Sequence, residues 1–396
     1  MQSPIYLDAH ATTPVDPRVA EVVLRMMTED FGNAASVQHE FGNVAQRAVE
    51  QSRELIAGAI GAKPRELVFT SGATESNNLA IRGLIERADD SRKKIVGLIT
   101  EHKAVLDPLA RAARRGFEVQ TVGIQGADCP RPGVVDLDEL RAAVTDETLL
   151  VCAMLANNEI GVIQPIQAIA EICHQRGALL FCDAVQALGK IPINLADLGV
   201  DLASFSAHKL YGPQGVGALF VRRGVSLTAQ VDGGGHERGA RSGTLNVPGI
   251  AGFGKAVEIC QQEMPMESKR LSVLRDQLLA GLCERLHGVF LNGPPLDAKC
   301  DDGSLLRLPH NLNCSFAGVD GDALMAAIRP LAVSSGSACT TSDPRPSHVI
   351  SALGRNDELT RAGLRFGLGR FNTKAETEQA IEIVANAVTR LRTMRG

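Results

Sequence analysis

The chain has 396 residues, of which 44% are hydrophobic and 22% charged, and its formal net charge is −4 at pH 7. This length and hydrophobic content favour a large core and two domains, while the small net charge gives no basic surface for nucleic acid. No stretch approaches the roughly 20 apolar residues of a membrane-spanning helix, and the N-terminus lacks the features of a signal peptide. We therefore expect a cytoplasmic protein without direct contact with nucleic acid or membrane.

The nine cysteines are scattered and include no CxxC pair. This spacing argues against a zinc site or a disulfide framework. Cys152, Cys173 and Cys182 lie in apolar segments, and we expect them to be packing residues.

The predicted elements alternate between helices and strands after an N-terminal arm of residues 1–14. Apolar residues recur every three or four positions from Phe41 to Ile56, which predicts an amphipathic helix. Short apolar runs then alternate with helical segments, which is typical of an α/β fold. The predicted strands lie near residues 67–70, 95–100, 117–122, 148–153, 178–182, 201–205 and 217–221.

A second, smaller domain is predicted for the C-terminal third. The boundary is expected between Cys260 and Lys269, in a polar stretch, so that residues 15–260 form a large domain and residues 261–396 a small one. A strand near Asn311 and a last helix starting near Ala375 predict an α+β arrangement for the small domain.

The first candidate site residues follow the strand at residues 67–70. A tight Ser71–Gly72 turn leads into a helix, whose first N–H groups, at Gly72, Ala73 and Thr74, could bind an anion such as phosphate. The Thr74 hydroxyl would add another donor. Alternatively, Ser71 or Thr74 caps this helix and binds nothing else.

The next candidate, Asp183, stands at the end of the apolar run that begins at Ala178. Ligands in open α/β sheets bind outside the carboxyl ends of the strands, so this carboxylate could face a bound group. An aspartate in this position is also a common helix cap.

The segment from Asp201 to Gly217 is the most informative, because a short apolar strand runs into Ser-Ala-His-Lys and a glycine-rich turn. A lysine at the end of a buried strand is costly to charge, so we expect a lowered pKa and a free amine at Lys209 that can attack carbonyls. Ser206 and His208 offer donors for an anion. The alternative is a surface lysine beside a loop.

Together these positions predict a pyridoxal phosphate site. This cofactor is held by a lysine as a Schiff base and needs a carboxylate against its pyridinium nitrogen. Asp183 suits the ring nitrogen, Gln186 could hydrogen-bond the ring hydroxyl, and Lys209 suits the covalent link. The order and separation of Asp183 and Lys209 match fold-type I pyridoxal enzymes.

The whole chain resembles the cysteine desulfurases of the pyridoxal-dependent class V aminotransferase group, in the branch of the housekeeping iron–sulfur and nitrogen-fixation desulfurases. The resemblance implies a large domain with a mostly parallel seven-stranded sheet and a smaller α+β domain that carries a catalytic cysteine loop. It rests on motifs spread over nearly the whole chain: YLDAHATTPVDPRV, FTSGATESNNLAI, TEHKAVLD, NNEIGVIQPI, DAVQALGKIPI, SFSAHKLYGPQGVGAL, GGGHERGARSGT, SSGSACT and LRFGLGRF.

The resemblance also implies roles for residues that sequence chemistry alone leaves open. His102 is expected to stack on the cofactor ring and assist proton transfer, and Asn158 to lie beside the ring hydroxyl and the substrate carboxylate. Arg365 is expected to clamp that carboxylate, for which a bidentate guanidinium is suited. Thr244 is expected to reach the phosphate of the neighbouring subunit in a homodimer. Lys209 would also move a substrate proton.

Cys339 is the residue that distinguishes a desulfurase from an aminotransferase, because amino transfer needs Lys209 and Asp183 but not Cys339. Small and hydroxylic residues surround it, which predicts a loop with an exposed cysteine. By resemblance, its thiolate attacks the substrate sulfur, so that L-cysteine becomes L-alanine and a persulfide forms on Cys339.

Other functions and acceptors stay open at this point. A selenocysteine lyase or a cystine lyase would share the fold, and the selenocysteine lyase would not need Cys339 as sulfur acceptor. A non-catalytic protein could hold pyridoxal phosphate as a binding platform. The presence of Lys209, Asp183, His102, Cys339 and Arg365 argues against the platform. The sulfur acceptor could be an iron–sulfur scaffold, a tRNA-thiolation relay or DNA phosphorothioation machinery; the longer C-terminal tail with which housekeeping relatives dock their scaffold is not seen before Gly396.

Overall fold

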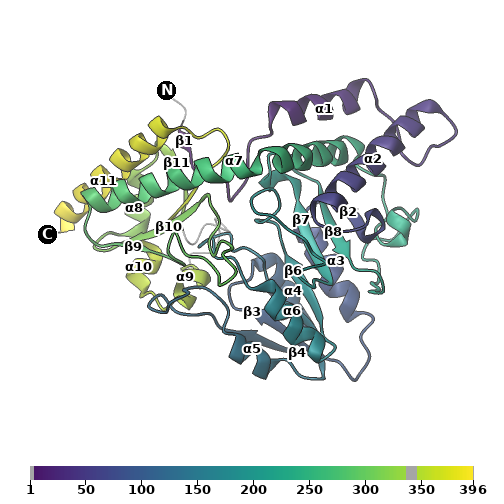
Figure 1. Ribbon diagram of the computed structural model, residues 1–396, viewed down its shortest axis with the longest axis horizontal. Helices are drawn as coiled ribbons and strands as arrows, with labels where there is room; N and C mark the ends of the chain where they lie inside the picture. Colours follow the sequence, from purple (N-terminus) through teal and green to yellow (C-terminus); the bar gives the residue numbers. More distant parts are fainter. Residues whose placement is uncertain (1–3, 336–345, 396) are drawn as a thin grey trace.

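A seven-stranded sheet forms the centre of the larger part of the molecule in the computed structural model, which describes residues 4–335 and 346–395 (Figure 1). The strands lie in the order β2-β8-β7-β6-β5-β3-β4. β8 is antiparallel to both of its neighbours, and all other pairs are parallel. This confirms the predicted mostly parallel seven-stranded sheet. The strands are β2 (Leu67–Thr70), β3 (Lys94–Leu98), β4 (Glu118–Val122), β5 (Thr148–Cys152), β6 (Leu179–Asp183), β7 (Leu202–Ser206) and β8 (Gly217–Val221).

The sheet is covered on both faces, which explains why most of its strands are apolar runs; the edge strand β4 is the exception and is partly exposed. Successive side chains of a strand point to opposite faces; in β5, Val151 belongs to one hydrophobic cluster and its neighbours Leu150 and Cys152 to another. The expected packing residues Cys152, Cys173 and Cys182 are buried. The helices of this part are α1 (Pro17–Thr28), α2 (Glu40–Ala59), α3 (Ala73–Ile85), α4 (Lys103–Ala113), α5 (Leu137–Ala143) and α6 (Ile166–Gln175), with short 3-10 turns η1 (Pro64–Glu66), η2 (Ala207–Lys209) and η3 (Glu237–Gly239).

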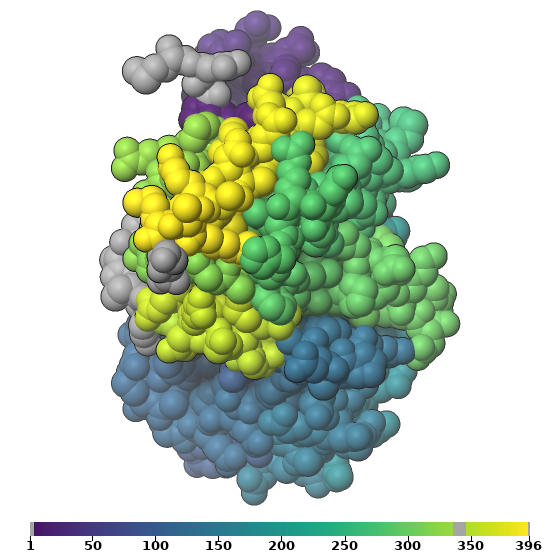
Figure 2. Space-filling view, turned by 90° about the vertical axis from the view of Figure 1, so that its left-hand side faces the viewer, coloured from purple at the N-terminus to yellow at the C-terminus, as the bar shows by residue number. Residues whose placement is uncertain are grey.

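The smaller part contains a four-stranded antiparallel sheet in the order β12-β13-β10-β9. The last helix packs along the second half of α7 (Val247–Arg285) (Figures 1 and 2). This arrangement confirms the smaller α+β unit in the C-terminal third. Its elements are β9 (Val289–Leu291), β10 (Asn311–Phe316), α8 (Gly321–Ala327), β12 (Ser334–Ser335), α9 (His348–Ala352), α10 (Asp357–Arg361), β13 (Gly363–Gly367) and α11 (Lys374–Arg395).

Helix α7 (Val247–Arg285) connects the two parts without a break. Phe253 and Val257 in its first half belong to the core of the larger part, whereas Leu274 and Leu278 in its second half belong to the core of the smaller part. The boundary expected between Cys260 and Lys269 therefore falls inside a continuous helix rather than at a linker, and the division at residue 260 stays a prediction.

The N-terminal arm passes between the two parts. β1 (Ile5–Tyr6) pairs in parallel with β11 (Leu331–Ala332) of the smaller part. A few residues later, the backbone N–H of Thr13 donates to the carbonyl of His208 in the larger part at 2.9 Å. The arm thus reaches the turn that contains Lys209. Among the described residues, no helix is long and apolar enough to cross a membrane.

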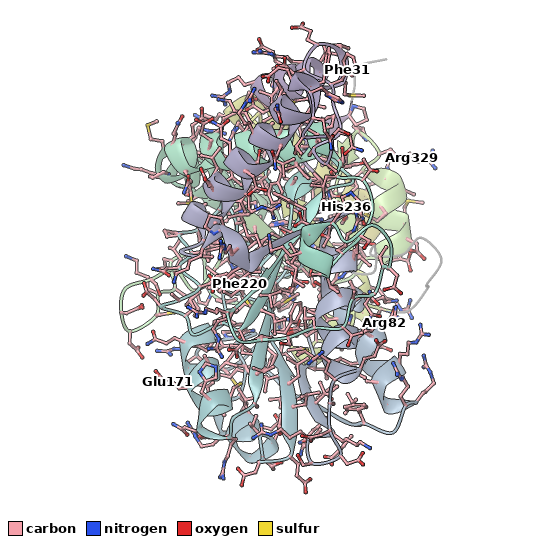
Figure 3. The ribbon with its side chains drawn as sticks, turned by 90° about the vertical axis from the view of Figure 1, so that its right-hand side faces the viewer. Phe31, Arg82, Glu171, Phe220, His236 and Arg329 are labelled. Atoms are coloured by element: carbon pink, nitrogen blue, oxygen red, sulfur yellow. The ribbon has the colours of Figure 1, made fainter. Side chains whose placement is uncertain are left out.

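The glycine-rich segment that follows β8 contains His236, which is labelled in Figure 3. A buried ion pair at the next residue, Glu237, fixes this segment. Glu237 Oε1 lies 2.7 Å from Arg53 Nη2 of α2, with both side chains at most 3% exposed. Glu237 Oε2 also accepts the backbone N–H of Phe69 at 2.7 Å. This carboxylate therefore joins α2, β2 and η3 into one unit beside the candidate anion-binding turn.

Replacing Arg53 by Met is expected to lower the free energy of unfolding by about 3–5 kcal/mol, because the Glu237 carboxylate would stay buried without its partner. Urea denaturation measures this change. The matched control is Arg47→Met in the same helix, whose partner Glu40 is exposed, and it should cost less than about 1 kcal/mol. Equal losses in the two variants would contradict the role of the buried pair.

Candidate active site

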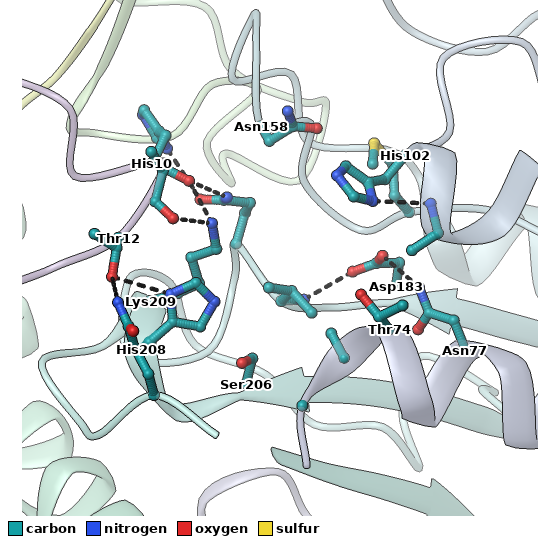
Figure 4. Close-up of a pocket in the computed structure, with 18 of the residues that line it drawn as sticks. His10, Thr12, Thr74, Asn77, His102, Asn158, Asp183, Ser206, His208 and Lys209 are labelled. Carbon is teal, nitrogen blue, oxygen red and sulfur yellow. Dashed lines mark hydrogen bonds between the residues drawn. The ribbon is translucent and has the colours of Figure 1, made fainter. Parts of the chain in front are cut away.

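A cavity of about 690 Å³ opens at the carboxyl ends of the central strands (Figure 4). Besides the predicted residues it is lined by residues of the N-terminal arm, His10, Ala11 and Thr12. Thr244 is exposed and does not line it, and Cys339 lies outside the described residues. The predicted residues that the fold brings together here are Ala73, Thr74, His102, Asn158, Asp183, Gln186, Ser206, His208, Lys209 and Arg365.

One end of the cavity offers hydrogen-bond donors that suit an anion. α3 begins at Ala73 after Gly72, whose φ of +149° favours glycine. The helix has no side-chain cap among the described residues, so the alternative role predicted for Ser71 and Thr74 is not seen. Its first N–H groups stay available to a ligand at the positive end of the helix dipole. Ser206 and His208 line the same cavity.

The middle of the cavity presents the Asp183 carboxylate. Its Oδ1 accepts a hydrogen bond from the backbone N–H of Val185, and its Oδ2 accepts one from Asn77 Nδ2, both at 3.2 Å. An ionised carboxylate offers about four acceptor positions, so Asp183 can still accept a proton-bearing ring nitrogen. Asn77 was not predicted; its position one helical turn after Thr74 was the available signal.

Lys209 Nζ faces the N-terminal arm across the cavity. It donates to the carbonyl oxygens of His10 at 2.7 Å and Ala11 at 2.6 Å. His208 Nδ1 lies 3.1 Å from Thr12 Oγ1. The arm residues were missed as site residues, although they belong to the motif YLDAHATTPVDPRV.

The turn after Lys209 is anchored through Tyr211. The backbone there has φ = +65°, a strained conformation for a bulky residue. The cationic groups of Lys190 and Arg370 lie over the Tyr211 ring, 4.2 and 4.3 Å from its centre. The Tyr211 hydroxyl donates to Glu267 Oε1 of α7 at 3.0 Å. These contacts hold the backbone that positions Lys209.

His102 borders the cavity on the opposite side from Lys209 (Figure 4). Its Nδ1 accepts the backbone N–H of Ala104 at 3.1 Å, which leaves the proton of the neutral ring on Nε2. Burial lowers the pKa of His102. A neutral imidazole with an Nε2–H group is therefore present beside Asp183.

Glu101, the residue before His102, is fully buried. Its Oε1 accepts the backbone N–H of Met154 at 2.6 Å, and its Oε2 has no hydrogen-bond partner among the described residues. Burial raises the pKa of Glu101 to about 8, and the nearby Asp183 carboxylate adds to the increase. The side chain is thus protonated at neutral pH, where a second buried negative charge beside Asp183 would be costly.

Arg365 of β13 brings the smaller part to the cavity. Its Nη1 donates to the carbonyl of Asn158 at 3.1 Å, and its Nη2 contacts Asp8 Oδ1 at 2.7 Å. Its buried Nε has no partner among the described residues. A planar cation with an unsatisfied donor at this position is suited to a carboxylate ligand.

The described residues that follow the Cys339 segment are tied to the same loops. Ser347 Oγ donates to Glu159 Oε2 at 2.5 Å and also caps α9. His348 Nε2 lies 3.1 Å from the carbonyl oxygen of Glu101. The chain beyond residue 345 is therefore fixed beside the loops that carry His102 and Asn158.

Replacing Glu101 by Gln tests its protonation state. The unfolded state releases the Glu101 proton near the usual carboxyl pKa, whereas the folded state keeps it up to about pH 8. The wild type should therefore lose stability relative to the variant by up to about 1.4 kcal/mol per pH unit above pH 4.5. Urea denaturation between pH 5 and 8 measures the free energy of unfolding of both proteins. As a control, Glu147→Gln at an exposed position should show the same pH dependence as the wild type. A difference between Glu101→Gln and the wild type that does not change with pH would contradict the protonated state of Glu101.

Comparisons with known proteins agree with this geometry. Residues 5–379 match the family model described as aminotransferase class-V. The chain is similar to "Cysteine desulfurase IscS" of Anaeromyxobacter sp. (strain Fw109-5), with 50% identity over 100% of this chain and 95% of that protein. It is 51% identical to the protein of the same name from Escherichia coli O9:H4 (strain HS), over 99% of this chain and 94% of that protein.

The chain is also similar to a protein of known structure. The protein titled "NIFS-LIKE PROTEIN" superposes with a TM-score of 0.88 and 36% identity, covering 98% of this chain and all of that chain. The described residues contain no group of three or more His, Cys, Asp or Glu side chains that could hold a metal ion.

Proposed function

This chain belongs to the aminotransferase class-V family and to its cysteine desulfurases, and we propose that it converts L-cysteine to L-alanine and passes the sulfur on as a persulfide of Cys339. The observation that carries the proposal is the assembly of Lys209, Asp183 and the uncapped start of α3 around one cavity that Arg365 also lines. The lysine and carboxylate suit the cofactor, and the arginine suits an amino-acid substrate.

The enzyme depends on pyridoxal phosphate, and the cavity fits this cofactor. The first turn of α3, Ser206 and His208 would hold its phosphate, Asp183 its ring nitrogen and Lys209 its aldehyde carbon. When bound, pyridoxal phosphate withdraws electrons from the substrate Cα, which makes the bonds around that carbon easier to break. Gln186 would donate to the ring hydroxyl, and His102 would cover the ring.

The chain's own residues would orient the substrate and move its protons. Arg365 and Asn158 hold the substrate α-carboxylate, which fixes Cα near Lys209. The Lys209 amine then accepts and returns the Cα proton. His102, neutral and protonated on Nε2, can donate a proton and then recover one.

Cys339 would take the sulfur. Its thiolate forms an S–S bond with the substrate sulfur while the C–S bond breaks, and the bonding electron pair goes to the substrate carbon, which is then protonated to give alanine. Cysteine and the enzyme thiol thus become alanine and an enzyme persulfide, without an external oxidant or reductant. The persulfide would serve iron–sulfur cluster assembly or another thiolation pathway through an acceptor protein.

The active unit is proposed to be a homodimer. Thr244 is exposed and lies outside the cavity of its own chain, which suits a residue that reaches the phosphate site of a second copy. Glu237 lies seven residues before Thr244, and its buried ion pair with Arg53 of α2 would hold this segment in place for the contact.

Replacing Lys209 by Ala should abolish alanine formation from L-cysteine, because no other described amine lines the cavity. Alanine is measured by chromatography after incubation with excess pyridoxal phosphate. Lys255→Ala in α7, outside the cavity, is the control and should keep wild-type activity. Turnover by the Lys209 variant would remove this residue from the chemistry.

Replacing Cys339 by Ala should lower sulfur release by three orders of magnitude or more, since loss of a positioned nucleophile typically costs about that much. Mass spectrometry of wild-type protein incubated with L-cysteine and no reductant should find one added sulfur atom on the Cys339 peptide. Cys283→Ala, which removes an exposed cysteine outside the cavity, should change neither result. Alanine without added sulfur on Cys339 would favour a lyase, and sulfur release by the Cys339 variant would also contradict the persulfide.

Replacing Arg365 by Lys should lower kcat/KM for L-cysteine about 10- to 100-fold, because an ammonium group cannot bind both oxygens of a carboxylate in one plane. Steady-state kinetics measures the change, and most of it should appear in KM. Arg355→Lys, whose guanidinium bonds lie outside the cavity, is the matched control. An unchanged KM for the Arg365 variant would argue against a carboxylate clamp.

A further inference from the structure

A series of four buried side chains, linked by hydrogen bonds, leads from the smaller part to the cavity and ends at Gln186. Arg307 Nη1 donates to Asn311 Oδ1 at 3.0 Å. Asn311 Nδ2 lies 3.1 Å from His10 Nε2, and His10 Nδ1 lies 3.0 Å from Gln186 Oε1. All four residues are at most 7% exposed, so water does not compete for these hydrogen bonds.

Arg307 determines which group is the donor and which the acceptor in each hydrogen bond of this series. A guanidinium can only donate, so Asn311 Oδ1 must face Arg307. Asn311 Nδ2 then donates, to the carbonyl of Glu159 at 3.0 Å and to His10. His10 Nε2 is therefore an unprotonated acceptor, and the ring proton lies on Nδ1.

The last hydrogen bond sets the orientation of the Gln186 amide. His10 Nδ1–H donates to Gln186 Oε1, and Gln186 Nε2 donates back to the His10 carbonyl at 3.0 Å. Rotating the amide by a half turn would bring two acceptors together at one contact and two donors at the other. The second hydrogen of Gln186 Nε2 has no partner in residues 4–335 or 346–395 and is left for the cavity that Gln186 lines.

We propose that His10 is a positioning residue of the cofactor site, which orients Gln186 so that an N–H group, and not its oxygen, donates to the phenolic oxygen of pyridoxal phosphate. This inference rests on the proposed function. A donor at this position favours the deprotonated phenolic oxygen, because hydrogen bonds to a charged acceptor are stronger than those to a neutral one. Gln186 alone could present either end of its amide.

The surroundings keep His10 neutral, as the assignment requires. The centre of its ring lies 4.4 Å from that of His310, and the positive charges of Arg365, Lys209 and Lys190 act on it. Burial and these cations lower the pKa of His10 to about 3. A proton on both ring nitrogens would also place an N–H against Asn311 Nδ2.

The first test is the protonation of His10 in the full-length protein without cofactor. Nitrogen-15 NMR of histidine-labelled protein should show Nδ1 protonated and Nε2 unprotonated for the signals that disappear in His10→Phe, between pH 6 and 8. A ring protonated on Nε2, or on both nitrogens, would overturn the inference. This readout needs neither cofactor nor turnover.

The second test is the affinity of cofactor-free protein for two ligands, pyridoxal phosphate and its analogue without the ring hydroxyl. His10→Phe should weaken binding of pyridoxal phosphate about tenfold and leave binding of the analogue nearly unchanged, because the analogue has no oxygen to receive the Gln186 N–H. The control is His310→Phe, which keeps the ring contact and removes an Nδ1 that has no partner among the described residues; it should bind both ligands like the wild type.

Equal losses for the two ligands in His10→Phe would show a general structural effect and overturn the positioning role. Failure of the wild type to bind pyridoxal phosphate would reject the proposed function, and this assignment with it. The two failures are distinguishable, since the first leaves wild-type binding intact.

Discussion

The site depends on one constraint, the parallel pairing of β3, β5, β6 and β7. Parallel strands end at the same edge of a sheet, so the segments that follow them must meet there. His102 follows β3, Asn158 follows β5, Asp183 ends β6, and Ser206 ends β7 immediately before the Lys209 turn. Backbone hydrogen bonds thus bring together residues that are up to about a hundred positions apart, before any side chain contributes. What the side chains add is orientation and charge.

The smaller part contributes through buried polar contacts rather than through the sheet. Arg365 binds the Asn158 carbonyl, and Ser347 binds the carboxylate of Glu159, the next residue along. Asn311 and Asn313 both donate to the Glu159 carbonyl as well. One short segment after β5 is therefore the meeting point of three separate stretches of the smaller part. Because unsatisfied buried polar groups are costly, these contacts specify a single arrangement of the two parts more strongly than apolar packing alone would.

Local sequence signals were sufficient for the sheet, for Asp183 and Lys209 at strand ends, and for the turn at which α3 starts. Each of these depends on a strand or turn that can be recognised within a few residues. His102, Asn158 and Arg365 needed the family resemblance, because a lone histidine, asparagine or arginine carries no pattern of its own. Asn77 and His10 were missed for a different reason: their roles come from partners far away in sequence, such as Asn311, which is 301 positions from His10. The predicted boundary after Cys260 rested on polar composition, which a long exposed helix produces as readily as a linker does.

The unbroken helix α7 has a mechanical consequence. Its 39 residues correspond to about 58 Å at 1.5 Å per residue, and each half is embedded in a different hydrophobic core. Pro265 lies inside the helix between these two halves, and because proline has no N–H to donate, the backbone hydrogen bond of this turn is missing and the helix bends there at the lowest cost. A rotation of the two cores against each other would therefore bend α7 at Pro265, and the N-terminal arm, which is hydrogen-bonded to both parts, would have to follow that movement.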